Sequence, residues 1–126
     1  MNKETIFSQK APDAIGPYSQ AIKCGNMLFI SGQLPVDKET GVMPLDIKLQ
    51  TKQSLENIKH IIAAAGYSMK DIVKTTVFVK DLGHFQAIND VYSTYFPNNP
   101  PARACIEVAG LPKGAGVEIE VIACAD

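Results

Sequence analysis

The sequence has no tryptophan, only two histidines and no excess of positive charge. Its 12 Lys and Arg residues against 13 Asp and Glu residues give a net charge of −1, and no two basic residues are adjacent. A protein that binds nucleic acid needs a basic face to neutralise phosphate groups. The charge balance therefore argues against nucleic acid as a partner.

Cysteine is equally scarce. The three cysteines, Cys24, Cys105 and Cys124, are odd in number, form no Cys-x-x-Cys pair and match no metal-ligand spacing. We expect free thiols in a reducing cytoplasm and no metal site. The two histidines, His60 and His84, form neither a ligand pair nor a catalytic triad, so we assign both a structural role.

Long hydrophobic runs are also absent. No apolar stretch could cross a membrane, and none follows Met1–Thr5 as it would in a signal peptide. The sequence shows no linker, repeat or low-complexity segment. With 126 residues, of which 46% are hydrophobic and 20% charged, the chain is predicted to form one cytoplasmic domain over residues 1–126, without membrane contact.

Periodicity predicts six strands and two helices. The predicted strands cover residues 5–8, 19–24, 27–34, 72–80, 103–109 and 117–123. Gly25-Asn26 is a hairpin signal between the second and third strands. The first helix is predicted from the N-cap Asp46 to Gly66, because apolar residues recur every three or four positions between them. The second helix is predicted over about residues 84–96.

Both predicted helices are amphipathic, so each has one apolar face to bury. An α+β fold with a single sheet and both helices on one face satisfies this requirement. The other face of the sheet then needs cover, because several of its residues, Ile30 and its neighbours among them, are apolar. An uncovered apolar face in so small a protein indicates self-association.

Charged residues within the last two predicted strands are the first candidates for chemistry. Arg103 stands at the start of one strand, and Glu118 and Glu120 lie inside the other. Charge in a strand is costly unless it meets a partner or a ligand, and the guanidinium of arginine matches a carboxylate. The combination indicates a small anionic substrate. Each residue also has a simpler explanation. Arg103 could form a structural salt bridge, to which we give the same weight as to substrate binding, and the two glutamates could face solvent.

A hairpin between these two strands would separate Arg103 from Glu118 by about 17 Å. Either the strands do not pair in this way, or Arg103 meets an acid elsewhere, for which a site between subunits is one solution. Alternation places Arg103, Cys105 and Glu107 on one face. For Cys105, a small core residue is the better interpretation, because no histidine lies close enough in the pattern to activate its thiol.

Three further positions are candidates for a binding site. Tyr18 follows Gly16-Pro17 in a loop, where core packing is its default role. Ser31-Gly32 interrupts an apolar strand, and a glycine there indicates that a ligand or a neighbouring group closely approaches the backbone. Asn89 lies one turn after Phe85, near the buried face of the second helix, where its amide needs a partner.

Several separate motifs, in order along almost the whole chain, carry a family resemblance. They are Ala14-Ile15-Gly16-Pro17-Tyr18-Ser19-Gln20, Ile30-Ser31-Gly32-Gln33, Gln53-Ser54-Leu55-Glu56-Asn57, Val73–Val79, Pro101-Ala102-Arg103 and Val117-Glu118-Ile119-Glu120. On these motifs the chain resembles the Rid family (reactive intermediate deaminases, also called YjgF), and it is most similar to the RidA branch. Gly110 departs from the pattern, since many relatives have arginine there, and this change concerns the rim of the cleft or the subunit surface.

The resemblance implies a chorismate-mutase-like fold and a homotrimer with a central β-barrel and three clefts between subunits. It implies hydrolytic deamination of reactive 2-enamine and 2-imine acids, such as 2-aminoacrylate, to 2-oxo acids and ammonia, with no metal or cofactor. Arg103 would bind the substrate carboxylate, and Glu118 would activate a water molecule. The pocket would be lined by Tyr18, Ser31, Gly32, Asn89 and Cys105.

Some relatives are described as RNA-acting translation inhibitors or as regulatory small-ligand binders. RNA cleavage is disfavoured by the charge balance and by the lack of a histidine pair for acid–base work. A regulatory binder would need Arg103 but not Glu118, so the presence of both favours the enzyme.

Overall fold

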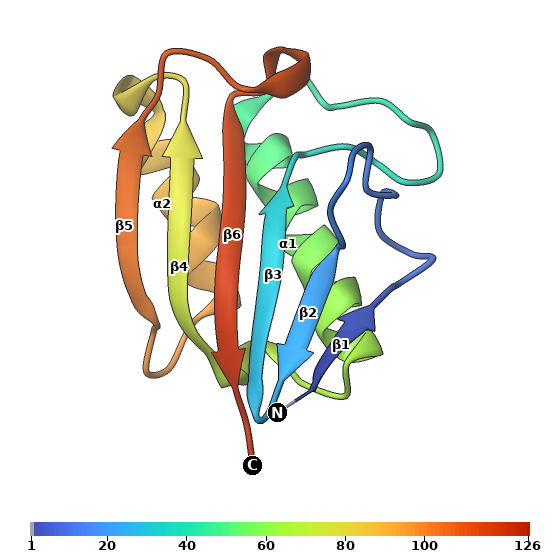
Figure 1. Ribbon diagram of the computed structural model, residues 1–126. Coiled ribbons are helices and arrows are strands. Elements are labelled where there is room, and N and C mark those ends of the chain that lie inside the picture. The colour runs from blue at the N-terminus through green and yellow to red at the C-terminus, as the bar shows by residue number, and fades with distance from the viewer. Residues whose placement is uncertain (1) are drawn as a thin grey trace.

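The computed structural model describes residues 2–126, which form one six-stranded sheet and two α-helices (Figure 1). The strands are β1 (Lys3–Ile6), β2 (Ala21–Cys24), β3 (Met27–Gln33), β4 (Ile72–Val79), β5 (Ala102–Glu107) and β6 (Val117–Cys124). The helices are α1 (Ile47–Ala64) and α2 (Phe85–Tyr95), and the short 3-10 turns are η1 (Met69–Asp71), η2 (Leu82–His84) and η3 (Pro112–Gly114).

The strand order of the sheet is β1-β2-β3-β6-β4-β5. All neighbours are antiparallel except β4 and β5, which run parallel. The last strand along the chain, β6, therefore lies between β3 and β4, and β5 forms an edge of the sheet. Because β5 and β6 are not neighbours, they form no hairpin, which is the first of the two alternatives that the sequence left open.

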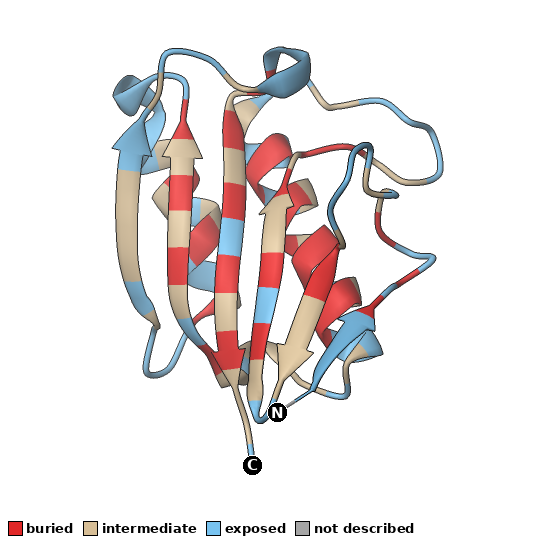
Figure 2. Cartoon of the chain, viewed as in Figure 1, coloured by how far each residue is buried: buried red, intermediate tan, exposed pale blue. Residues whose placement is uncertain are grey.

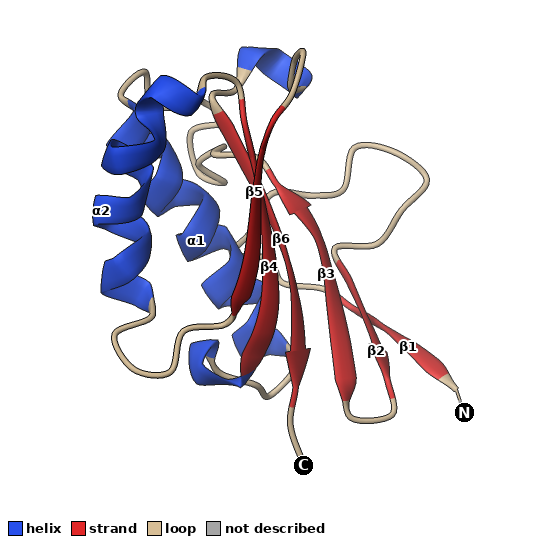
Figure 3. Ribbon diagram, turned by 90° about the vertical axis from the view of Figure 1, so that its left-hand side faces the viewer, coloured by secondary structure: helices blue, strands red, loops and turns tan. Residues whose placement is uncertain are grey.

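Both helices pack on one face of the sheet, and the opposite face carries no helix (Figure 3). The predicted α+β architecture, a single sheet with two helices on one side, is confirmed. The core lies between the two layers and is fully buried; it includes Leu28, Val77 and Ile119 from the sheet, Leu55, Ile58 and Ile62 from α1, and Ile88 from α2.

Local signals account for the ends of α1. A carboxylate oxygen of Asp46 accepts a hydrogen bond from the backbone N–H of Leu49 at 3.0 Å, as expected of an N-cap. Beyond the other end, Gly66 has a φ of +81°, a left-handed conformation that glycine adopts without strain. The first strand differs from its prediction: β1 ends at Ile6, because the N–H of Ser8 bonds to the side chain of Gln20 at 2.7 Å instead of a neighbouring strand.

Buried positions alternate with more exposed ones along the strands (Figure 2), and several of the more exposed residues on the open face are apolar. Phe29 and Ile106 are 43% and 45% exposed on this face, and Phe78, the neighbour of Ile106 in β4, is half-buried. The placement of Ile30 on the open face was wrong: Ile30 is 4% exposed and pairs with Val121 in the row that faces the helices. In a central strand an apolar residue suits either face, so alternation alone did not fix which set points inward.

Among residues 2–126, no helix is both long enough and apolar enough to span a membrane.

Candidate active site

A bulge in β3 shapes the first group of candidate residues. Ile30 pairs with Val121 and Gln33 with Ile119, so Ser31 and Gly32 together face a single residue of β6. The N–H of Ser31 donates to the carbonyl of Gln20 at 2.9 Å. Its hydroxyl donates to the carbonyl of Ser19 at 2.6 Å. Both bonds fix the bulge against the segment that follows Tyr18.

Gly32 lies directly against the side chain of Glu118. A Cβ atom at position 32 would stand 2.5 Å from Oε2 of Glu118 and 2.9 Å from its Cδ, closer than carbon atoms can approach. The glycine is therefore required by the position of this carboxylate. The group that approaches the backbone of the strand at this point is a neighbouring side chain.

The environment of Glu118 favours its protonated form. Partial burial raises the pKa of the Glu118 carboxyl, and the negative charge of Glu120 raises it further. Glu120 itself is exposed on the same face of β6. A carboxyl whose pKa is shifted toward neutrality can accept a proton from water and return it within one catalytic cycle.

Tyr18 projects from the loop between β1 and β2 and is 51% exposed. Its hydroxyl oxygen accepts a hydrogen bond from the N–H of Ile15 at 3.4 Å, which leaves the hydroxyl proton free to donate to a ligand. Tyr18, Gly32 and Lys113 line a small hollow of about 50 Å³. We call Tyr18, Ser31, Gly32 and Glu118 the acidic half-site.

Arg103 belongs to a second group, built on β5 and α2. Its Nη1 donates to Oδ1 of Asn89 at 2.7 Å. The guanidinium carbon lies 4.8 Å from the ring centre of Tyr92 and 5.4 Å from that of Phe85, both within cation–π range. Arg103 is therefore held by three side chains from successive turns of α2. Asn89 was expected to need a partner, and the partner is Arg103.

Phe85 and Tyr92 were not recognised from the sequence as part of the site. Their spacing with Asn89 placed them on one face of α2, where an apolar role sufficed to explain them. The Tyr92 hydroxyl also shares a 2.8 Å hydrogen bond with Thr75, which fixes the ring beneath Arg103. No carboxylate among residues 2–126 forms a salt bridge with Arg103, so within the chain the structural salt-bridge interpretation is wrong.

Cys105 lies on the same side of β5 as Arg103 and packs against the core. Burial raises the pKa of its thiol, an effect that the nearby Arg103 opposes in part. A raised pKa keeps the thiol protonated at neutral pH and makes it a poor nucleophile. We call Phe85, Asn89, Tyr92, Arg103 and Cys105 the basic half-site.

The two half-sites do not meet within one chain. Arg103 points to the helix side of the sheet and Glu118 to the open side. Across the sheet, Glu118 of β6 pairs with Phe78 of β4, which pairs with Ile106 of β5. Ile106 lies three residues along β5 from Arg103. Two strand spacings and three residues place their Cα atoms about 14 Å apart. One small substrate cannot contact both groups of the same chain.

A hollow of about 950 Å³ lies along α1 and α2 and contains none of these residues; four lysines form part of its lining. The residues that the structure describes also bring together no group of three His, Cys, Asp or Glu side chains that could hold a metal ion.

The sequence and the fold of this chain are similar to those of known proteins. A family model described as Endoribonuclease L-PSP matches residues 8–125. The crystal structure of the YjgF gene product of E. coli superimposes with a TM-score of 0.95 at 49% identity, covering 98% of this chain and 99% of that one. The chain belongs to the YjgF/Rid family.

Relatives of this Rid protein carry several kinds of name. A RutC family protein of Pyrococcus horikoshii is 56% identical over 122 residues, which is 96% of this chain and 97% of the relative. The 2-iminobutanoate/2-iminopropanoate deaminase of Escherichia coli is 51% identical over 123 residues, 95% of this chain and 96% of the relative. The crystal structure of E. coli TdcF with bound serine has a TM-score of 0.95 at 48% identity, covering 98% and 99% of the two chains. The family and the fold that the motifs indicated are confirmed.

Proposed function

We propose that this Rid protein hydrolyses small 2-imino acids, and the 2-enamine acids that tautomerise to them, to 2-oxo acids and ammonia. The observation that carries the proposal is the state of Arg103. Its guanidinium is fixed by Asn89 and two aromatic rings but has no carboxylate partner within residues 2–126. A rigid and unpaired arginine is suited to bind the carboxylate of a substrate through two parallel hydrogen bonds. A bound serine in the structure of TdcF supports an amino-acid-like ligand.

The proposed site forms between two copies of the chain. Each chain carries one basic and one acidic half-site, and a ring of subunits brings the basic half-site of one chain to the acidic half-site of the next. A homotrimer whose open sheet faces form a central barrel would achieve this. The exposed Phe29 and Ile106 on the open face support such burial.

The chemistry then follows from the two groups. Arg103 holds the substrate carboxylate, and the Tyr18 hydroxyl of the adjoining half-site donates a hydrogen bond. Glu118 of the same half-site takes a proton from water as the water oxygen bonds to C2 of the imine. Glu118 gives this proton to the nitrogen as the C2=N double bond becomes single, which forms a carbinolamine. Glu118 next takes the proton of the new C2 hydroxyl and passes it to the nitrogen as the C2–N bond breaks, so a 2-oxo acid and ammonia leave. An imine carbon is already electrophilic, so the Cys105 thiol takes no part.

Coupling to an enzyme that releases imino acids tests the proposal. A pyridoxal-phosphate-dependent threonine dehydratase produces 2-iminobutanoate, whose conversion to 2-oxobutanoate can be followed directly. We expect the wild-type protein to accelerate this conversion at catalytic concentration and Glu118→Gln not to. An unchanged rate of oxo-acid formation with wild-type protein would contradict the proposal.

The free state of the three cysteines supports a cytoplasmic site of action, because thiols stay reduced there.

One observation favours a second candidate, the binding of RNA. Three lysines of α1, Lys48, Lys52 and Lys59, share a helix face and line the 950 Å³ hollow together with Lys70. Asp90 neutralises only Lys48, at 3.4 Å. This patch could attract phosphates, although His60 and His84, which lie on separate elements, offer no acid–base pair for cleavage. RNA binding that a Lys52→Glu/Lys59→Glu variant abolishes, without loss of imine hydrolysis, would establish this second role.

A regulatory binder of small acids is the remaining alternative. It would bind 2-oxobutanoate through Arg103 but would not turn over the imine. The comparison of wild type with Glu118→Gln separates the two, because only an enzyme loses turnover in that variant while retaining affinity for 2-oxobutanoate.

A further inference from the structure

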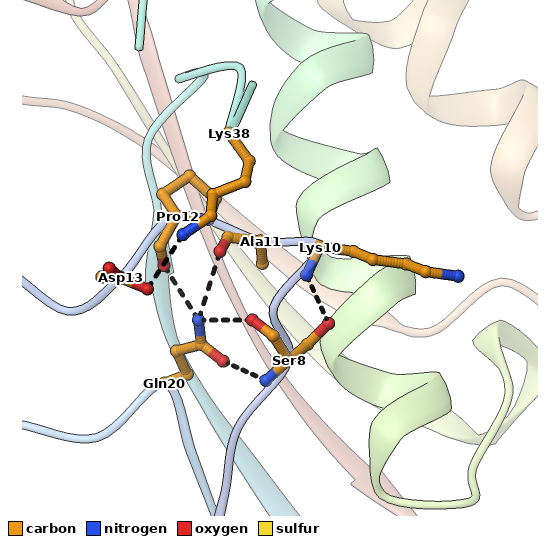
Figure 4. Close-up of polar contacts among 7 residues, drawn as sticks. All are labelled: Ser8, Lys10, Ala11, Pro12, Asp13, Gln20 and Lys38. Carbon is orange, nitrogen blue, oxygen red and sulfur yellow. Dashed lines mark hydrogen bonds and ion pairs between the residues drawn. The ribbon is translucent and has the colours of Figure 1, made fainter. Parts of the chain in front are cut away.

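The side chain of Gln20 is a buried tether at the base of the loop that carries Tyr18. Gln20 is 3% exposed. Its Oε1 accepts a hydrogen bond from the N–H of Ser8 at 2.7 Å (Figure 4). Its Nε2 faces three carbonyl oxygens, those of Pro12 at 2.9 Å, Ser8 at 3.2 Å and Ala11 at 3.5 Å. One carboxamide thus bonds to four backbone groups of residues 8–12, a segment that has no strand partner.

Apart from this carboxamide, the loop is held by Ala11, which is fully buried in the core, and by the two hydrogen bonds from Ser31 to the carbonyls of Ser19 and Gln20. Ile15 and Tyr18 are 67% and 51% exposed, so their side chains contribute little burial. An ion pair joins Asp13 to Lys38 at 3.0 Å, but both side chains are solvent-accessible, and such pairs stabilise weakly. The carboxamide of Gln20 is therefore the main polar connection for the first part of the loop, residues 8–12.

The backbone beside Gln20 reaches the bulge of the acidic half-site. The carbonyl of Gln20 accepts from the N–H of Ser31 at 2.9 Å, and the carbonyl of Ser19 accepts from the Ser31 hydroxyl at 2.6 Å. Ser31 precedes Gly32, which contacts Glu118. Gln20 therefore connects the loop on one side to the catalytic carboxylate on the other.

We infer that Gln20 is a positioning residue that sets the Tyr18 hydroxyl relative to Glu118. It contacts no substrate and acts through the loop and the bulge. This inference rests on the proposed deaminase function, because it assigns Tyr18 a task in substrate binding. Gln20 immediately precedes β2, so a residue anchored to the sheet controls the placement of an exposed loop residue.

The test is a double-mutant cycle with Gln20→Met, which keeps the volume of the side chain and removes its polar atoms. We expect kcat/KM for 2-iminobutanoate to fall about 10- to 100-fold, the loss typical of a displaced binding group. Tyr18→Phe should reduce kcat/KM in the wild-type background but have almost no further effect when combined with Gln20→Met. Effects that multiply instead would overturn the inference.

A control separates positioning from simple destabilisation. Ile62 is fully buried in the core away from both half-sites, so Ile62→Ala lowers stability without touching the loop. Assayed well below its melting temperature, Ile62→Ala should retain wild-type kcat/KM. Equal losses of activity in Ile62→Ala and Gln20→Met would show that Gln20 acts only through stability.

Hydrogen exchange of backbone amides tests whether Gln20 fixes the loop, independently of whether the protein hydrolyses imines. The amides of Ser8 and Ser31 should exchange faster in Gln20→Met and remain protected in Ile62→Ala. A wild-type protein that does not hydrolyse imines overturns the proposed function, and exchange then decides whether Gln20 fixes the loop. Unchanged protection of Ser8 and Ser31 in Gln20→Met overturns the tether itself.

Discussion

Replacement of Gly32 by alanine is a small change with a large expected effect on catalysis. The added Cβ would stand 2.5 Å from Oε2 of Glu118, 2.9 Å from its Cδ and 3.2 Å from its Cγ. Non-bonded carbon atoms prefer separations of about 3.5–4.0 Å. The Glu118 carboxylate must therefore move by about 1 Å, whereas the backbone at position 32 can accommodate alanine because its φ is not positive.

A displacement of about 1 Å at a reacting group can reduce the rate by about 10²-fold. We therefore expect Gly32→Ala to lower kcat for imine hydrolysis by about two orders of magnitude. In the proposed site, Arg103 of the other half-site holds the substrate carboxylate, so we expect the affinity for 2-oxobutanoate to change little. Thermal stability should also change little, because the displaced side chain lies at the open face rather than in the core.

Single-turnover hydrolysis of 2-iminobutanoate and calorimetric binding of 2-oxobutanoate measure these two quantities. Gly110→Ala is the matched control, since a Cβ at position 110 meets no atom within 4 Å. It should leave both quantities unchanged. If Gly32→Ala hydrolyses imines at the wild-type rate, the carboxylate next to Gly32 is not the catalytic base.

Four further substitutions test individual residues. Arg103→Lys keeps the charge but loses the paired donors, and we expect kcat/KM to fall about 10- to 100-fold with an unchanged circular dichroism spectrum; wild-type activity would make Arg103 structural. Cys105→Ser should keep most of its activity, and mass spectrometry should detect no thiol adduct with substrate, since a covalent intermediate is not expected. Glu118→Gln should lose about 10²- to 10⁴-fold in kcat, whereas Glu120→Gln should lose little. The pKa of Glu118 in the folded protein lies above its ordinary value of 4.5. As pH rises between these two pKa values, the unfolded chain releases the Glu118 proton while the native protein still holds it, so the native state loses stability relative to the unfolded state. Wild type should therefore lose stability relative to Glu118→Gln between pH 4 and 7 in urea titrations, and a constant difference across these pH values would refute the raised pKa.

The elements of the fold were predictable where local chemistry decides them. The N-cap Asp46 and the left-handed Gly66 mark the ends of α1 in the sequence as they do in the structure. The order of the strands was not predictable in the same way. The position of β6 between β3 and β4 depends on contacts between segments far apart in the chain, and no local pattern encodes such pairing.

The candidate site shows the same division. The helical period indicated that Asn89 lies near a buried face and needs a partner, but only the packing of α2 on β5 identifies that partner as Arg103. Phe85 and Tyr92 had an adequate explanation as apolar helix residues, which concealed their contact with the guanidinium. Ile30 was assigned to the wrong face because alternation in a buried strand does not reveal which side is covered.

The central claim is that Arg103 of one chain and Glu118 of another act on the same substrate. Subunit complementation tests it most directly. Arg103→Lys and Glu118→Gln proteins, each nearly inactive alone, are mixed in equal amounts, unfolded and refolded together. In a randomly mixed cyclic oligomer about one quarter of the intersubunit sites would combine an intact Arg103 with an intact Glu118, so about a quarter of the wild-type activity should return. Activity no higher than the average of the two separate variants would contradict a site shared between subunits.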